Sequence, residues 1–254
     1  MTETPNKPIS EVGLVQLIPN MLTIASLCAG LSAIRFGVQG NYILAVQLIM
    51  AASVLDGLDG RVARYLSSDS KMGAELDSLA DFVNFGVAPP MVIYFWALQD
   101  MRSAGWISVL FFAVCCVLRL ARFNVSTKAD PADETAAPDS HFVGIPSPAG
   151  ALLVMLPMFI SFAFSETALL PDFIICGYMI FVGLSMISRV KTWSFKTVKV
   201  SRENVKFFLL AFAIVGAAVF TYAWITLIVL CLGYLAMVIC ALLPKKSALS
   251  KKTK

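Results

Sequence analysis

The sequence has little charge, one histidine and no long polar region. Charged residues make up 14% of the 254 residues and hydrophobic residues 58%, which is too apolar for an ordinary soluble domain. The six cysteines all fall in apolar stretches without the spacing of zinc ligands, which argues against a zinc site or a disulfide framework. His141 lies in a predicted loop, and we assign it no catalytic role. The polar start, "MTETPNKPIS", lacks the pattern of a cleavable signal peptide.

Apolar residues are instead concentrated in blocks close to the roughly 20 residues that cross a bilayer as a helix. We find eight blocks, at 14–37, 42–59, 76–98, 104–123, 146–165, 170–188, 206–222 and 223–243. The sequence therefore predicts an all-α integral membrane protein, a polytopic helical bundle with about eight transmembrane helices. The last two blocks have so short a join that we expect them to form a helical hairpin.

The basic residues predict the orientation in the membrane. With the N-terminus in the cytoplasm, all of the 20 Lys and Arg residues except Arg35 and Arg102 fall on the cytoplasmic side, as the positive-inside rule requires. Both termini are then cytoplasmic, in a bacterial-type inner membrane. Because the charges cluster beside the spans, they favour contact with anionic lipid headgroups, and we expect no nucleic-acid partner.

Two polar inserts interrupt the apolar blocks. Residues 126–141, rich in Ala, Asp, Pro and Thr, predict a cytoplasmic connecting loop. Residues 189–206 are basic and carry Trp193 and Phe195, which favours a segment lying along the membrane surface. Neither insert is long enough to suggest a separate soluble domain.

Four aspartates lie where the second and third blocks meet, within "DGLDGRVARYLSSDSKMGAELDSLAD" (56–81). Helical spacing places Asp56 and Asp59 on one face of the second helix, and Asp77 and Asp81 on one face of the third. Facing each other across a short turn, the four carboxylates would converge at the cytoplasmic border of the membrane. Ionisable groups there are costly and usually functional. Clustered carboxylates need a cation between them, and oxygen ligands suit Mg²⁺ or Mn²⁺, with Ca²⁺ also possible.

This stretch resembles the signature of the CDP-alcohol phosphatidyltransferase family. The signature is Asp, two residues, Asp-Gly, two residues, Ala-Arg, eight residues, Gly, three residues, Asp, three residues, Asp, and every fixed position is present. The resemblance implies a six-helix catalytic core over residues 1–190 and a homodimer. Residues 191–254 would add a basic interfacial segment, two transmembrane helices and a Lys-rich cytoplasmic tail.

The resemblance also implies roles for individual residues. Two divalent metals would be bound by Asp56, Asp59, Asp77 and Asp81, and Asp81 would also be the catalytic base. The site for the CDP group and lipid phosphate would contain Asn20, Thr23, Asp59, Gly60, Ala63, Arg64 and Gly73.

Three further stretches resemble the family members that use L-serine as the alcohol. They are "PNMLTIASLCAG" with Pro19, Asn20 and Thr23, "LRLARFN" with Arg119, Arg122 and Asn124, and "FVGIPSPAGA" with Gly144, Pro146 and Pro148. Arginine binds carboxylates through two hydrogen bonds, so we expect Arg119, Arg122 and Asn124 to bind serine. Asn84 and Pro90 depart from this pattern, which has serine and alanine there.

The expected reaction transfers the phosphatidyl group of CDP-diacylglycerol to L-serine and releases CMP. One alternative is a sibling enzyme that uses glycerol 3-phosphate or another alcohol, although such relatives usually continue "LDPxADK" where this chain has "LDSLADF". A second alternative is a cation transporter with an aspartate ion site, which leaves the glycine and arginine positions of the motif unexplained.

Overall fold

The structure, a computed structural model, describes residues 17–66, 68, 70–128, 141–165, 169–188, 191–193 and 205–242. The chain divides into two compact units, residues 1–84 and 85–254. The polar N-terminal stretch, most of the 126–141 loop, most of the 189–206 segment and the Lys-rich tail lie outside the described residues.

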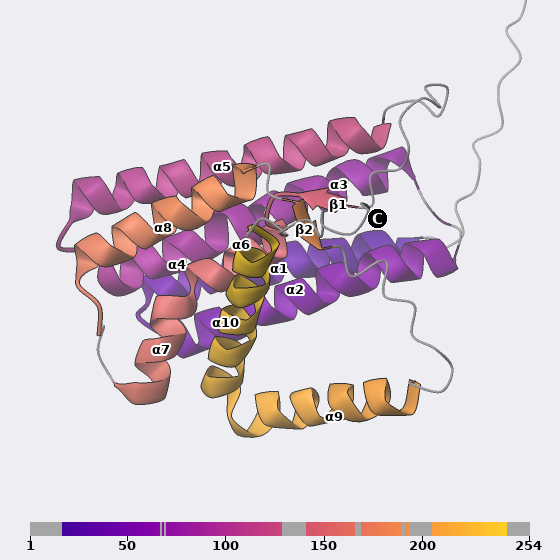
Figure 1. The fold of residues 1–254 in the computed structure, drawn as a ribbon. Helices are drawn as coiled ribbons and strands as arrows, with labels where there is room; N and C mark the ends of the chain where they lie inside the picture. Colours follow the sequence, from indigo (N-terminus) through magenta and orange to yellow (C-terminus); the bar gives the residue numbers. More distant parts are fainter. Residues whose placement is uncertain are drawn as a thin grey trace, which may run out of the picture. The chain divides into compact units, whose positions relative to one another are not determined.

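The first unit is built on two long helices, α1 (Ile18–Val38) and α2 (Tyr42–Tyr65), which pack side by side, with α3 (Lys71–Asp81) against α1 (Figure 1). The chain reverses direction at Gly40, whose φ of 78° suits glycine. Asn41 then caps α2, because its side chain accepts a hydrogen bond from the Leu44 N–H at 3.3 Å.

Small and polar residues form the buried face of α1, which packs against α2 and, at Gly30, against Asn84. This buried face consists of Pro19, Thr23, Ser26, Gly30, Ala33 and Gly37. Their spacing of three to four residues makes one helical stripe, and small residues allow membrane helices to approach closely. The Ser26 hydroxyl accordingly reaches across to donate to the Ala52 carbonyl oxygen at 3.0 Å.

A π-helix, η2 (Phe82–Val87), joins α3 to α4 (Ala88–Ala97), so that residues 71–97 form one candidate span. Pro89 and Pro90 follow directly inside this helix. Proline has no N–H and collides with the carbonyl group four residues earlier. A local change to wider π-turns relieves that conflict, and it places the irregular backbone immediately after Asp81.

The second unit contains α4, α5 (Arg102–Lys128), α6 (Ser147–Val154), α7 (Leu156–Phe164) and α8 (Asp172–Ile187). Helices α5 and α8 run side by side (Figure 1). Gly183 makes this possible, since a Cβ there would lie 3.3 Å from Cys115 Sγ and 3.4 Å from Phe112 Cα. Helices α6 and α7 meet at a 40° bend just before Pro157.

A short antiparallel ribbon in the second unit was not predicted. Strand β1 (His141–Val143) pairs with β2 (Lys191–Trp193). Gly144, with a φ of 88°, follows β1, and a Cβ there would be 2.5 Å from the Met186 carbonyl oxygen. Close approach to the end of α8 therefore explains this glycine. The all-α prediction is confirmed apart from this ribbon.

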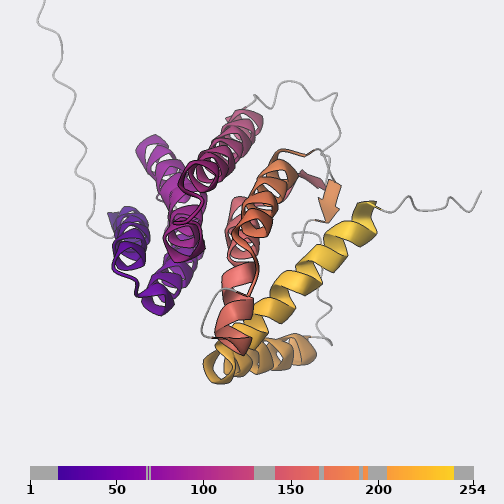
Figure 2. The same ribbon diagram turned by 90° about the vertical axis from the view of Figure 1, so that its left-hand side faces the viewer.

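The last two helices, α9 (Val205–Thr221) and α10 (Ala223–Leu242), are joined by a single residue, Tyr222. An antiparallel helix pair needs a connection of about 2–5 residues. Helices α9 and α10 diverge from their junction in both views (Figures 1 and 2), so they form an open corner instead of the expected hairpin. Helix α10 packs on α7 and β2, and Trp224 contacts Phe162 with ring centroids 4.9 Å apart.

Each of the eight apolar blocks forms helix, which confirms a multi-pass membrane protein. Within the described residues, five helices or continuous helical segments are long and apolar enough to span a bilayer, and the bent pair α6–α7 would make six. Helix α8 has 16 residues and α9 has 17, fewer than the roughly 20 needed for a straight crossing. The number eight and the cytoplasmic position of both termini stay predictions.

Candidate active site

The candidate site is built around the turn between α2 and α3 in the first unit. Helix α2 ends at Tyr65 and α3 begins at Lys71. Ser70 caps α3, since its hydroxyl oxygen accepts a hydrogen bond from the Gly73 N–H at 2.9 Å. The cap fixes the first turn of α3 and thereby orients the face that carries Asp77.

Three of the four motif aspartates meet in space. One carboxylate oxygen from each of Asp56, Asp59 and Asp77 lies within 4.8 Å of the other two. Oxygens on opposite sides of Mg²⁺ or Ca²⁺ are separated by at most about 4–5 Å, because each metal–oxygen bond measures about 2.0–2.6 Å. The spacing therefore fits ligands of one divalent cation, and the binding of two metals by all four aspartates stays a prediction.

Asp81 lies beside this cluster rather than within it. Its carboxyl group is at hydrogen-bonding distance from that of Asp56. The Oδ1 atoms of Asp56 and Asp81 are both buried, and neither has a hydrogen-bond partner among the described residues. Buried carboxylate oxygens without partners are costly. These two oxygens are thus oriented for a cation or a proton that the protein alone does not supply.

Asp59 is held by α1. Its side chain is 3% exposed, and its Oδ2 accepts a hydrogen bond from the Thr23 hydroxyl at 2.7 Å. That hydroxyl also lies 3.1 Å from the Pro19 carbonyl oxygen one turn earlier. The sequence suggested Thr23 as a nucleotide contact, whereas the structure uses its hydroxyl to orient a carboxylate.

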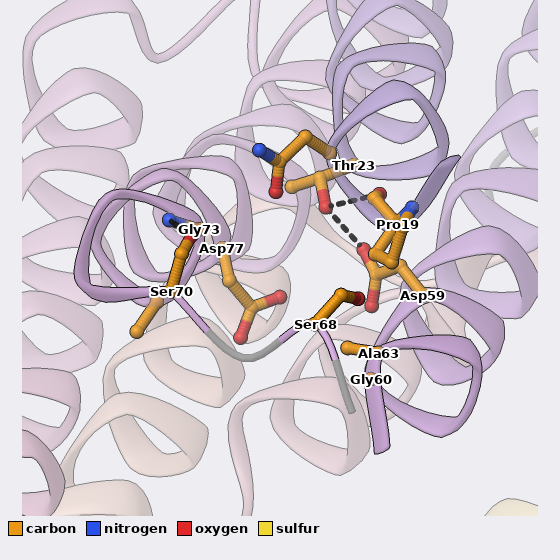
Figure 3. Close-up of a pocket in the computed structure, with 11 residues that line it drawn as sticks. Pro19, Thr23, Asp59, Gly60, Ala63, Ser68, Ser70, Gly73 and Asp77 are labelled. Atoms are coloured by element: carbon orange, nitrogen blue, oxygen red, sulfur yellow. Dashed lines mark hydrogen bonds between the residues drawn. The ribbon is translucent and has the colours of Figure 1, made fainter. Parts of the chain in front are cut away.

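A cavity of about 180 Å³ opens next to the aspartates, and its walls come from α1, α2, the turn and α3 (Figure 3). One water needs about 10–15 Å³ on a comparable measure, so the cavity has room for a much larger polar group. Asp59 and Asp77 point into it from facing helices (Figure 3). It is lined by Pro19, Asn20, Thr23, Asp59, Gly60, Ala63, Ser68, Ser70, Gly73, Ala74 and Asp77.

Glycine is favoured at the two motif positions, Gly60 and Gly73, for different physical reasons. A Cβ at Gly73 would lie 2.9 Å from Asn20 Oδ1 and 3.0 Å from Ser70 Oγ, so α1 and the helix cap exclude a side chain there. A Cβ at Gly60 would meet nothing within 4 Å. Since Gly60 lines the cavity, its missing side chain leaves that space open to a ligand.

One predicted residue of the CDP site lies away from the cavity. The exposed Arg64 side chain folds back along α2, and its Nε donates to the Gly60 carbonyl oxygen at 3.0 Å. Arg64 is not among the cavity-lining residues. Asn20, Thr23, Asp59, Gly60, Ala63 and Gly73, in contrast, all line it, and their binding to the CDP group stays a prediction. Ser68 and Ser70 also line the cavity, and neither was predicted. The Ser-Lys-Met-Gly start of α3 is a helix-capping pattern that could have indicated Ser70.

The predicted serine-binding residues lie near the end of α5 in the second unit. Arg119 Nη1 donates to the Ser147 hydroxyl oxygen at the start of α6. Arg122 Nη1 donates to the Ile187 carbonyl oxygen at 3.1 Å, which satisfies a carbonyl at the end of α8. Asn124 lies on the next turn of α5. Arg122 therefore has a structural function that its sequence context did not reveal.

Comparison with known proteins agrees with this site. The profile of the CDP-alcohol phosphatidyltransferase family matches residues 16–179. Among curated proteins, the chain is similar to a CDP-diacylglycerol–serine O-phosphatidyltransferase of Mycobacterium leprae, at 40% identity over 87% of this chain and 73% of that protein. Proteins of the same name from Helicobacter pylori (strain J99) and Bacillus subtilis match at 37% and 36% identity, over 76% and 74% of this chain and 78% and 96% of theirs.

Proposed function

The chain belongs to the CDP-alcohol phosphatidyltransferase family, and from this premise we propose that it transfers the phosphatidyl group of CDP-diacylglycerol to L-serine. The products are phosphatidylserine and CMP. The observation that carries the proposal is the group of aspartate oxygens beside an open cavity in the first unit. Such an arrangement suits a diphosphate bound through divalent metal, and the similar proteins are named for this reaction.

The residues fit the divalent metal that the reaction needs. Three carboxylate oxygens lie within 4.8 Å of one another, and the Oδ1 atoms of Asp56 and Asp81 are buried without a partner among the described residues. We propose that Asp56, Asp59, Asp77 and Asp81 hold two ions, Mg²⁺ or Mn²⁺, with Ca²⁺ as a further candidate. When bound, such ions neutralise charge on the diphosphate and favour CMP as a leaving group.

The chain's own residues then position the reacting groups. Asn20, Gly60, Ala63 and Gly73 line the cavity and would bind the CDP moiety and lipid phosphate, joined by Arg64 if its side chain leaves Gly60. The serine hydroxyl attacks the phosphorus that carries diacylglycerol, and the phosphorus–oxygen bond to CMP breaks. Asp81 accepts the hydroxyl proton. Its Oδ1 is suited to this, because it makes no hydrogen bond among the described residues.

Serine recognition belongs in this proposal to Arg119, Arg122 and Asn124. The distribution of basic residues supports it, because Arg61 and Arg64 after the second predicted span and Arg119 and Arg122 at the end of the fourth are predicted to lie on the same side of the membrane. By the positive-inside rule, that side is predicted to be cytoplasmic. Arg119 is the strongest candidate, since its guanidinium and the Ser147 hydroxyl form one polar group.

We further propose that residues 1–190 form the catalytic core of a homodimer in a bacterial-type inner membrane. All four aspartates and the proposed serine-binding residues lie within this range, and residues 191–254 add to it. Chemical cross-linking in native membranes, compared at two expression levels, tests the dimer without depending on activity.

An alcohol panel tests the function directly. The purified protein in lipid vesicles would receive CDP-diacylglycerol, Mg²⁺ or Mn²⁺, and either L-serine, glycerol 3-phosphate, inositol or no alcohol. We expect stoichiometric CMP and phosphatidylserine with L-serine only. CMP release that is selective for glycerol 3-phosphate would assign the sibling reaction instead. Metal flux into vesicles without CMP release would overturn the assignment in favour of transport.

A further inference from the structure

The last helix, α10, buries one face within the second unit. Leu227, Ile228 and Cys231 on this face are at most 9% exposed, and Cys231 Sγ lies 3.6 Å from the Leu152 carbonyl oxygen. Tyr234 follows Cys231 by three residues, which places it on the same face one turn further along. The packing of α10 on α7 and β2 therefore carries Tyr234 into the interior of this unit.

The hydroxyl group of Tyr234 is buried without a hydrogen bond. Its oxygen is inaccessible to solvent and has no partner among the described residues. A buried hydroxyl without a partner costs about 1–3 kcal/mol, and most tyrosines avoid this by pairing the hydroxyl or exposing it. Tyr178 follows that rule, because its hydroxyl donates to the Leu153 carbonyl oxygen at 2.8 Å. The buried hydroxyl of Tyr234 therefore needs an explanation, whereas the hydrogen-bonded hydroxyl of Tyr178 does not.

Arg119 supplies the context. Arg119 is the charged group whose electrostatic influence reaches the Tyr234 hydroxyl, and Arg119 Nη1 donates to the Ser147 hydroxyl oxygen. Three segments far apart in sequence, α5, the start of α6 and α10, therefore place a guanidinium and two hydroxyl groups in one region of the second unit. All three groups can donate hydrogen bonds, and a guanidinium with hydroxyl donors matches the two oxygens of a carboxylate.

We propose that Tyr234 is a substrate-specificity residue, which donates its hydroxyl hydrogen bond to the carboxylate of the alcohol substrate beside Arg119 and Ser147. This inference rests on the proposed function and extends it to a helix outside the 16–179 family match. It also gives α10 a role in substrate recognition, whereas its apolar sequence suggested none.

Tyr234→Phe tests the proposal, because it removes one oxygen and leaves the packed ring. We expect the KM for L-serine to rise about ten- to a hundredfold, the range for a lost hydrogen bond to a charged group. The KM for CDP-diacylglycerol and the metal requirement should change less than about twofold. Serinol, which lacks the carboxylate, should be a poor substrate of the parent protein and lose nothing further in the variant.

Two matched substitutions separate recognition from structure. Tyr178→Phe removes a structural hydrogen bond and should lower the melting temperature while leaving the serine KM unchanged. Tyr222→Phe alters a 64% exposed side chain and should change neither quantity. If Tyr234→Phe does not fold, Ser147→Ala provides the same test, with a selective rise in the serine KM expected.

The outcomes distinguish a failure of the proposed function from a failure of the role proposed for Tyr234. A parent protein that releases no CMP with L-serine contradicts the proposed function itself. An active parent whose Tyr234→Phe and Ser147→Ala variants keep the parental serine KM contradicts the role of Tyr234 alone. Equal losses with serine and serinol would also overturn it, because the effect would not then depend on the carboxylate.

Discussion

Gly30→Ala should destabilise the first unit, because the glycine faces the amide of Asn84. A Cβ at position 30 would overlap Asn84 Oδ1 and lie 3.1 Å from Asn84 Cγ. Asn84 is fully buried, and its Nδ2 donates to the Ser26 hydroxyl oxygen at 2.6 Å. The amide cannot move aside without losing that bond, so the two effects add.

The magnitude follows from three contributions to the free energy of unfolding. A lost buried hydrogen bond costs about 1–3 kcal/mol, and overpacking costs about 1–3 kcal/mol. Replacing a helical glycine by alanine returns up to about 1 kcal/mol. We therefore expect Gly30→Ala to destabilise by about 1–6 kcal/mol. Because Asn84 lies three residues after Asp81 in η2, turnover should fall as well.

The assay is reversible unfolding in mixed detergent micelles, followed by tryptophan fluorescence, for a double-mutant cycle. Asn84→Ala removes the amide, so adding Gly30→Ala to that variant should be neutral or stabilise by up to about 1 kcal/mol. Gly177→Ala is the control, since a Cβ there meets nothing within 4 Å. The reasoning would be refuted if Gly30→Ala kept the parental free energy of unfolding. It would also be refuted if Gly30→Ala lowered that free energy equally in the parent and in the Asn84→Ala variant.

Four further predictions concern the chemistry of the site. Asp81→Asn should lower kcat by about 10²–10⁴-fold while lipid-substrate binding persists; near-parental CMP release at saturating metal would disprove the base. Asp56→Asn should raise the Mg²⁺ concentration at half-maximal activity, because it removes a ligand charge, and an unchanged metal titration would remove it from the ligand set. Thr23→Val should weaken apparent metal affinity about 10–100-fold, as a lost carboxylate-orienting contact does, with little change in the KM for CDP-diacylglycerol; the reverse pattern would return Thr23 to the nucleotide. Arg119→Lys should raise the serine KM about ten- to a hundredfold, whereas Arg122→Lys should chiefly lower the melting temperature. If the KM values for serine and serinol rose equally, neither arginine would bind the serine carboxylate, and their role would be to set membrane topology or to bind phosphate.

Helical periodicity was enough to predict the centre of this site. Residue spacing fixes which side chains share a face of one helix, and a short turn forces two consecutive helices to lie close. Asp56, Asp59 and Asp77 are therefore found together without any knowledge of the remaining helices. The cavity-lining residues Asn20, Gly60, Ala63 and Gly73 were indicated by the resemblance to the family and not by periodicity.

The details that periodicity missed depend on contacts between distant segments. Nothing local indicates that Thr23 bonds Asp59 across 36 residues or that β1 pairs with β2. Arg64 has a long side chain whose direction depends on which acceptors surround it, and its own helix supplies one. Pro89 and Pro90 are a local signal for the π-helix. They require a wider turn, however, only because the helix continues without a break over residues 71–97, which the sequence did not reveal.

The two units divide the proposed reaction by chemistry. Every residue assigned to the metals or to the CDP group lies in residues 1–84, and every residue assigned to the alcohol lies in residues 85–254. Diphosphate and metal are common to all reactions of this kind, whereas the alcohol differs between siblings. On the proposed assignments, a change of alcohol would involve substitutions around Arg119, Ser147 and Tyr234 while the aspartate motif stays constant. This division explains why the motif in α2 and α3 identifies the reaction class so readily, although the choice of alcohol has to be sought in the second unit.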